Sequence, residues 1–270
     1  MTTPVVPVTP ATPVPTQRAD LAVVLGDDHV ATIEIQRPPN NFFDTMLITA
    51  IADALGELAE HTTCRAVVLC SAGRHFCAGA DFSGGDSPAD RTGPNLYQEG
   101  ARLFDQPLPV IAAVQGAAIG GGLGLALAAD FRVAAPEARF AANFAQLGFH
   151  HGFGLTVTLP RAVGEQAAQD LLYTGRRIDG AEALRLGLCD RLVAADELRA
   201  TARAWAAEIA TSAPLAVRSI RHTMRGRLAQ EVRAALAHER VEQDRLMTTD
   251  DWREGVAAVT ERRPARFTGR

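Results

Sequence analysis

Short apolar runs and segments of helical periodicity alternate through the first half of the chain. Apolar runs rich in β-branched and small residues predict strands at residues 21–25, 30–36, 66–70, 110–114, 131–134 and 139–142. Apolar residues at helical spacing predict helices at residues 45–60, 96–104 and 123–129. Asp44 stands directly before the first helix, where a side-chain oxygen caps free N–H groups. This alternation favours an α/β fold, which binds ligands at the carboxyl ends of its strands.

The pattern becomes almost wholly helical after Leu155. One of these helices is rich in Arg and Glu but carries an apolar stripe, formed by Leu228, Val232, Ala235 and Leu236. The start of the chain is instead rich in proline, valine and threonine, a composition typical of an extended segment. We therefore expect a disordered tail at residues 1–17, a core at 18–205 and a helical C-terminal region at 206–270.

The composition favours a globular protein over a nucleic-acid-binding or membrane protein. A chain of 270 residues with 47% hydrophobic content can bury a substantial core. The formal net charge of -4 gives no reason to expect nucleic-acid binding. The tail lacks the basic and apolar segments of a signal peptide, and the longest apolar stretch, 112–127, is interrupted by glycines and Gln115. We expect a cytoplasmic protein with no nucleic-acid or membrane partner.

The four cysteines lack the close paired spacing of metal sites and redox motifs. We expect them to be free thiols in a reducing compartment. His75 and Cys77 are close in sequence, but no third ligand or paired base accompanies them. The sequence therefore predicts no metal site, and a structural, buried role for Cys77.

Two segments of small residues carry the candidate chemistry. They are Phe76-Cys77-Ala78-Gly79-Ala80-Asp81 and Gly116-Ala117-Ala118-Ile119-Gly120-Gly121-Gly122, and each follows a predicted strand. Gly79 allows backbone angles that larger residues resist, and Gly121 should lie in the first turn of a helix, where free N–H groups favour an anion. Preorganised backbone amides stabilise a developing oxyanion by roughly 3–4 kcal/mol per donor. The two segments predict an oxyanion hole, and the alternative is that small residues only allow strand and helix to pack closely.

A dinucleotide site is a competing interpretation of the glycine-rich segment. Residues 120–124 also follow a predicted strand and open a helix. The fingerprint G-x-G-x-x-G lacks its third glycine here, and no acidic residue follows at the required distance. We therefore do not expect a nicotinamide cofactor.

Together with the segments 175–183 and 251–267, these motifs make the chain resemble the crotonase (enoyl-CoA hydratase/isomerase) superfamily over nearly all its length after the first twenty residues. The resemblance implies a spiral core of repeated ββα units, with a helical C-terminal region that packs a homotrimer or a dimer of trimers. It also implies an acyl-CoA ligand, so coenzyme A enters as part of the substrate and no separate cofactor is expected.

The resemblance also implies roles for individual residues. It assigns the oxyanion hole to the backbone N–H groups of Ala80 and Gly121. It places three residues beside the pantetheine and adenine of coenzyme A, namely Ala78, Asp81 and Phe82. Arg37 is a candidate phosphate contact, with a solvated surface arginine as the alternative.

Hydratases of this family use two glutamates that flank a water molecule. Alignment through the motifs places Gly124 and Phe144 at these positions, and neither side chain can move a proton. Neither hydration by a glutamate pair nor isomerisation by a single glutamate is therefore expected. The first hypothesis is a lyase or isomerase of this family that acts through a thioester enolate, and decarboxylation or hydrolysis of a CoA thioester stays open. The second is a catalytically silent protein that binds CoA thioesters.

His151 is the candidate acid or base. Many relatives have a proline at its position, and some decarboxylating relatives have a tyrosine near it. A histidine exchanges protons near neutral pH, so His151 is predicted to orient a carboxylate or to protonate an enolate. In the alternative interpretation, one residue of the pair His150 and His151 is a hydrogen-bonded core histidine and the other faces solvent.

Overall fold

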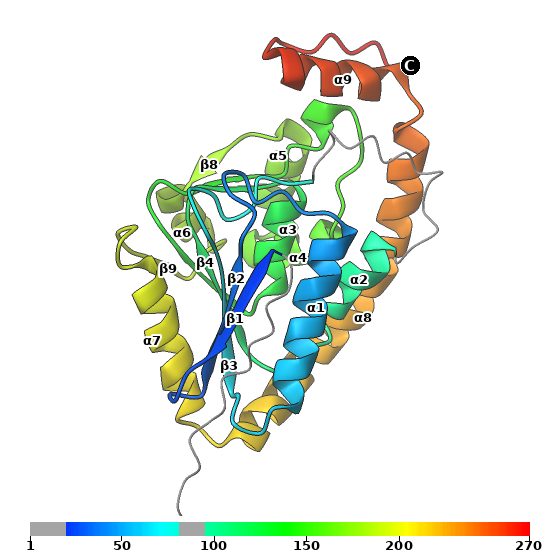
Figure 1. Cartoon of the computed structure of the whole chain (residues 1–270). Helices are drawn as coiled ribbons and strands as arrows, with labels where there is room; N and C mark the ends of the chain where they lie inside the picture. The colour runs from blue at the N-terminus through cyan, green and yellow to red at the C-terminus, as the bar shows by residue number, and fades with distance from the viewer. Residues whose placement is uncertain (1–19, 81–94) are drawn as a thin grey trace, which may run out of the picture.

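The computed structural model describes residues 20–80 and 95–270. The predicted tail and the predicted ligand contacts Asp81 and Phe82 lie outside these ranges. A six-stranded sheet forms the centre of the fold (Figure 1), in the order β1 (Leu21–Leu25), β2 (Val30–Ile35), β3 (Ala66–Ser71), β4 (Val110–Val114), β6 (Phe131–Ala134) and β9 (Arg191–Leu192). The hairpin of β1 and β2 is antiparallel and the other pairs are parallel. The predicted α/β alternation is confirmed.

Alternate residues of the central strands enter two separate apolar layers. Val68 and Cys70 of β3 pack with α7 (Leu198–Ala210) on one face of the sheet. Val67 and Leu69 pack with α1 (Thr45–Glu60) in the larger core on the other face. Figure 1 shows the sheet between these two helices. Burial on both faces explains why β3 and β4 are continuously apolar in sequence.

A second, three-stranded sheet contains β5 (Ala117–Ile119), β7 (Arg139–Ala141) and β8 (Ile178–Asp179). Strand β5 was not predicted, because three residues carry too little periodicity to mark a strand. Its hydrogen bonds come from two distant segments, β7 on one side and Cys77 on the other. Tertiary pairing therefore creates this strand.

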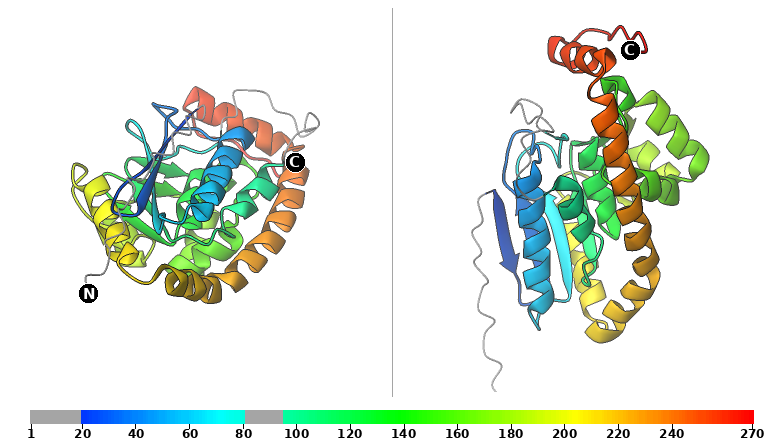
Figure 2. Two further views of the ribbon diagram at one scale, coloured as in Figure 1. Left: turned by 60° about the horizontal axis from the view of Figure 1, so that its bottom comes forward. Right: turned by 90° about the vertical axis from the view of Figure 1, so that its right-hand side faces the viewer.

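The other helices surround this core. They are α2 (Leu96–Arg102), α3 (Gly121–Ala128), α4 (Leu155–Val163), α5 (Glu165–Thr174), α6 (Gly180–Leu186), α8 (Pro214–Leu246) and α9 (Asp250–Glu261), with a 3-10 turn η2 (Ala145–Leu147). The long helix α8 runs along α2 and α4 and leads to α9, as Figure 2 shows. The predicted boundary at 205/206 falls inside α7.

Candidate functional site

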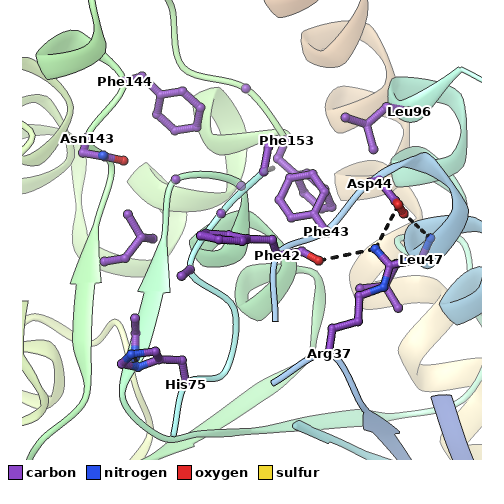
Figure 3. Close-up of a pocket in the computed structure, with 18 of the residues that line it drawn as sticks. Arg37, Phe42, Phe43, Asp44, Leu47, His75, Leu96, Asn143, Phe144 and Phe153 are labelled. Atoms are coloured by element: carbon purple, nitrogen blue, oxygen red, sulfur yellow. Dashed lines mark hydrogen bonds and ion pairs between the residues drawn. The ribbon is translucent and has the colours of Figure 1, made fainter. Parts of the chain in front are cut away.

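A cavity of about 2810 Å³ opens beside the two small-residue segments. Its walls come from the chain before α1, residues 78–80, the start of α3, the η2 region, the chain before α4 and the end of α8. Figure 3 shows the side chains that point into it. Typical small-molecule sites occupy about 300–1,000 Å³, so this cavity can hold a long ligand.

The first small-residue segment is fixed by hydrogen bonds on both sides. The Cys77 N–H donates to the Ala117 carbonyl over 2.9 Å, and the Phe43 N–H donates to the Gly79 carbonyl over 3.0 Å. Gly79 has φ of 111°, a conformation that favours glycine. The next residue, Ala80, lines the cavity, and its N–H donates to no acceptor within residues 20–80 and 95–270.

The second segment turns directly into helix α3. Gly120 precedes the helix and Gly121 is its first residue, which confirms the expected position of Gly121 in the first turn, although the helix was predicted to start at residue 123. The Gly121 N–H also lacks a protein acceptor in the described part of the chain. A Cβ atom on Gly122 would lie 2.2 Å from the Cys77 carbonyl oxygen, so only glycine allows this close approach of the two segments.

The structure thus brings the predicted residues Ala78, Ala80 and Gly121 to one cavity wall. Two amides that have no acceptor among the described residues, one of them at a helix N-terminus, suit an oxygen that carries negative charge. Because these donors belong to the backbone, no side chain needs to reorganise when that charge develops. Stabilisation of an oxyanion is the chemistry that this wall can perform.

Arg37 also lines the cavity, at the side opposite Asn143 and Phe144 in Figure 3. Its guanidinium forms ion pairs of 2.8 Å with Asp20 and 2.9 Å with Asp44. Burial alone would lower the pKa of Arg37, but the hydrogen bonds from the two carboxylates outweigh it and raise this pKa. The positive charge is therefore already compensated within the protein. Asp44 also caps α1, as predicted, by accepting a hydrogen bond from the Leu47 N–H.

The two positions of the family glutamates have an apolar environment. A Cβ atom on Gly124 would lie 2.6 Å from the Cβ atom of Phe153, so Phe153 occupies the space that a side chain at position 124 would need. The Phe153 ring packs edge-on against Phe43, with ring centroids 5.4 Å apart. Phe144 is buried and packs against Phe149 at the same centroid separation. At both predicted positions of these glutamates, the space is therefore filled by aromatic rings.

Glu239 of α8 is a buried residue that the sequence analysis missed. Its carboxylate accepts hydrogen bonds from the Gly154 N–H (2.8 Å), the Thr156 N–H (3.0 Å) and the Thr156 hydroxyl (2.6 Å). These bonds hold the chain on which Phe153 adopts a left-handed conformation, with φ of 62°. Its spacing could have revealed it, because position 239 falls on the same helix face as Val232 and Leu236. An acidic residue on an apolar stripe indicates a buried carboxylate.

His151 does not reach the cavity wall. Its Nε2 lies 2.8 Å from the Thr156 hydroxyl and 4.0 Å from a Glu239 oxygen, and its ring stacks on His150. Burial, together with the neighbouring His150 and His238, lowers the pKa of His151 to about 4. The ring is therefore neutral near pH 7 and bonded inside the protein, away from Ala80 and Gly121.

Polar side chains that the sequence analysis did not single out also face the cavity. The Tyr97 hydroxyl donates a hydrogen bond to Gln243, whose amide nitrogen donates to the His150 carbonyl over 2.8 Å. Asn143 lies beside the oxyanion segment, with Oδ1 only 3.4 Å from the position of a Cβ atom on Gly120. No motif marked these residues, because each comes to the cavity through tertiary packing.

The thiols and the other acids have structural environments. The four cysteines are free and buried, and burial raises the pKa of Cys77 to about 12, which excludes a thiolate nucleophile near neutral pH. Asp130 accepts a hydrogen bond from the Val110 N–H and pairs with Arg221 and Arg225 of α8. Within residues 20–80 and 95–270, no cluster of His, Cys, Asp and Glu could hold a metal ion. No helix there could cross a membrane.

Proteins of known family resemble this chain over most of its length. The family model described as enoyl-CoA hydratase/isomerase matches residues 26–270. Carnitinyl-CoA dehydratase of Proteus mirabilis is 35% identical over 249 residues, which cover 89% of this chain and 95% of that protein.

Solved structures extend this similarity to the fold. An enoyl-CoA hydratase/isomerase from Pseudoalteromonas atlantica superposes with a TM-score of 0.86 at 32% identity, over 92% of this chain and 100% of that one. An enoyl-CoA hydratase from Mycobacterium avium subsp. paratuberculosis gives a TM-score of 0.81 at 31% identity, over 92% and 98%. The fold is therefore the crotonase fold, and the chain belongs to the enoyl-CoA hydratase/isomerase family.

Proposed function

We propose that this protein is an acyl-CoA enzyme that stabilises the oxygen of a thioester enolate with the N–H groups of Ala80 and Gly121, without the usual glutamate pair. The observation that carries the proposal is the pair of amides on adjoining segments at one cavity wall, for which residues 20–80 and 95–270 provide no acceptor. The relatives named for enoyl-CoA and carnitinyl-CoA chemistry support a CoA thioester as the ligand.

The enolate can form by two routes. If a base removes the α-proton, the electron pair of the C–H bond passes into the enolate, and Gly124 and Phe144 offer no such base. If an α-carboxylate leaves as CO2, the electron pair of the C–C bond passes into the enolate, and no base is needed. A proton from solvent then completes the product. Loss of CO2 therefore fits the cavity wall, and hydrolysis of the thioester would use the same amides on a tetrahedral intermediate.

The binding mode follows the family. Ala78 lies beside the pantetheine in the proposed complex, and Asp81 and Phe82 stay predictions for the same part of the ligand. Coenzyme A enters as part of the substrate. A homotrimer or a dimer of trimers in the cytoplasm is proposed on the same grounds.

Two assays on the full-length protein test the proposal. In D2O, an acyl-CoA ester incubated with the enzyme is followed by mass spectrometry for deuterium at the α-carbon. In parallel, a malonyl-type CoA ester is followed for release of CO2. Enolate chemistry predicts catalysis of at least one of these reactions. A substitution that shifts the N–H group of Gly121, such as Gly122→Ala, should lower its rate about 100-fold or more. Catalysis that is insensitive to this substitution would overturn the proposal.

A second candidate function is binding of CoA thioesters without turnover. Gly124 and Phe144 favour it, because neither position supplies an acid or a base. Saturable binding of acyl-CoA esters without deuterium exchange, CO2 release or thioester hydrolysis would establish it in place of the enzyme.

A further inference from the structure

Aromatic side chains are concentrated around the cavity. Phe, Trp and Tyr make up only 6% of the chain. The cavity is nevertheless lined by Phe42, Phe43, Tyr97, Phe144, Phe149, Phe153 and Trp252. Small-molecule sites use such walls for apolar parts of a ligand, and rings prefer edge-on or offset contact with other rings.

Three of these rings surround the predicted oxyanion amide. A Cβ atom on Gly121 would lie 2.3 Å from Cζ of Phe43 and 3.5 Å from Cδ2 of Phe153. A Cβ atom on Gly120 would lie 3.7 Å from Cζ of Phe144. The rings therefore meet the first turn of α3 from two sides, as Figure 3 shows for the labelled phenylalanines. An acyl group whose carbonyl oxygen reaches Gly121 has to extend between them.

The ring wall is held rigidly. Phe43 and Phe153 pack edge-on at 66°, and the left-handed conformation of Phe153 is fixed by the bonds of Glu239 to Gly154 and Thr156. Phe144 packs on Phe149, which in turn packs on Trp252 of α9 with ring centroids 4.4 Å apart. Rings that are already ordered lose little entropy when a ligand binds, so this wall is suited to select the shape of the acyl group.

We infer that the site selects acyl-CoA esters whose acyl group carries an apolar ring beyond the α and β carbons, with Phe43, Phe144 and Phe153 as the residues that determine specificity. This inference rests on the proposed function, because it takes the thioester carbonyl to lie at Ala80 and Gly121. The ring of the ligand would lie against the cavity-facing edges of these phenylalanines, and it would make the edge-on contacts that an alkyl group cannot make.

Cinnamoyl-CoA and crotonyl-CoA provide a matched pair of probes, because they share the unsaturated thioester and differ only in a phenyl or a methyl group. Isothermal titration calorimetry on the full-length protein measures both dissociation constants. We expect cinnamoyl-CoA to bind at least tenfold more tightly, since each aromatic contact contributes a factor of about three to ten. Equal affinities would overturn this inference and leave the proposed function intact, whereas no binding of either ester would count against both.

Substitutions then locate the selectivity. Phe153→Leu and Phe144→Leu keep an apolar side chain and remove the ring, and each is expected to reduce the ratio of the two affinities at least threefold. Tyr173→Ala removes an exposed aromatic residue that does not line the cavity, and its ratio should match that of the unmodified protein. Circular dichroism confirms that each variant is folded. A ratio unchanged in both leucine variants would contradict the assignment.

Discussion

The two ends of the cavity are built from different parts of the chain. The end proposed as the oxyanion hole, called the oxyanion end, presents the backbone amides of Ala80 and Gly121, held by strand pairing and by close packing at Gly122. The acyl end uses side chains, chiefly Phe144 and Phe153. A backbone site persists when surrounding side chains change, whereas an acid or base is lost with a single substitution. Under the proposed function, the backbone end would therefore supply the oxyanion hole, and the side-chain end would select the reaction and the substrate.

The two ends also differ in how they are anchored. Several short hydrogen bonds within neighbouring segments hold residues 77–79. One carboxylate, that of Glu239, holds the chain that carries Phe153, from more than eighty positions along the sequence. A substitution that displaces the backbone should therefore disturb the oxyanion end. A substitution that removes the Glu239 carboxylate should disturb the acyl end.

Gly122→Ala should have the largest effect. The new Cβ atom would lie 2.2 Å from the Cys77 carbonyl oxygen, and backbone atoms cannot rotate away. We expect acyl-CoA turnover to fall about 100-fold or more and stability to fall by about 3 kcal/mol. Urea unfolding measures stability, and whichever of α-deuterium exchange and CO2 release the unmodified protein catalyses measures turnover. Gly56→Ala in α1 is the matched control, because its Cβ atom would meet nothing within 4 Å, and it should gain up to about 1 kcal/mol.

Glu239→Ala should have the next largest effect. It leaves the N–H groups of Gly154 and Thr156 without their acceptor, and hydrogen bonds to a charged group contribute about 1.5–3 kcal/mol. We expect a loss of about 3 kcal/mol in urea unfolding and a weaker preference for ring-bearing acyl groups. Glu231→Ala removes a partly exposed ion pair of the same helix and should cost less than about 1 kcal/mol. Equal losses in the two variants would refute the anchoring role of Glu239.

Gly124→Glu tests whether Phe153 occupies the space of the family glutamate. The substitution alone should destabilise the protein by about 2 kcal/mol, because Phe153 has to move. In the double variant Gly124→Glu/Phe153→Ala, the loss of unfolding free energy should be about 1 kcal/mol smaller than the sum of the losses in the two single variants. A double-mutant cycle in urea measures this coupling, and strictly additive losses would show that the two residues do not compete for space.

The buried His151 makes stability depend on pH. Its pKa of about 4 in the folded protein lies below the ordinary value of 6.5, so between these values the unfolded chain binds a proton that the folded chain does not. The stabilising contribution is complete above pH 6.5 and is lost as pH falls through about 4. We expect the protein to lose about 1–2 kcal/mol over this window relative to His151→Gln.

Urea unfolding at several pH values tests this expectation, with His222→Gln, an exposed histidine of α8, as the control. An identical pH profile for His151→Gln and the unmodified protein would contradict it. The same variant tests the predicted acid–base role of His151, because full turnover at pH 7.5 would show that the ring is not needed for catalysis.

Arg37→Gln should have the smallest effect. The guanidinium is paired with Asp20 and Asp44, which are partly exposed, and such pairs contribute less than about 1 kcal/mol. We expect the dissociation constant for an acyl-CoA ester to rise less than about threefold in calorimetry. A rise of tenfold or more would instead identify Arg37 as the phosphate contact.

Local signals identified most of the fold. The strand and helix pattern, the cap at Asp44 and the two small-residue segments all depend on neighbours within a few positions. Features that depend on distant pairing were missed, including strand β5 and the carboxylate of Glu239. His151 illustrates the same limit, because its contacts with Thr156 of α4 and with Glu239 of α8 arise from packing that a linear pattern does not record.

The sequence by itself determined the alternation of strands and helices and the two small-residue segments, and it predicted the oxyanion amides and the absence of both glutamates. Glycine and periodic apolar residues act through local backbone angles and spacing, which a linear pattern records. Only the tertiary structure decided that Phe153 fills the space beside Gly124 and that Glu239 holds it there. Such arrangements depend on side-chain volume and on the satisfaction of a buried charge between segments far apart in the chain.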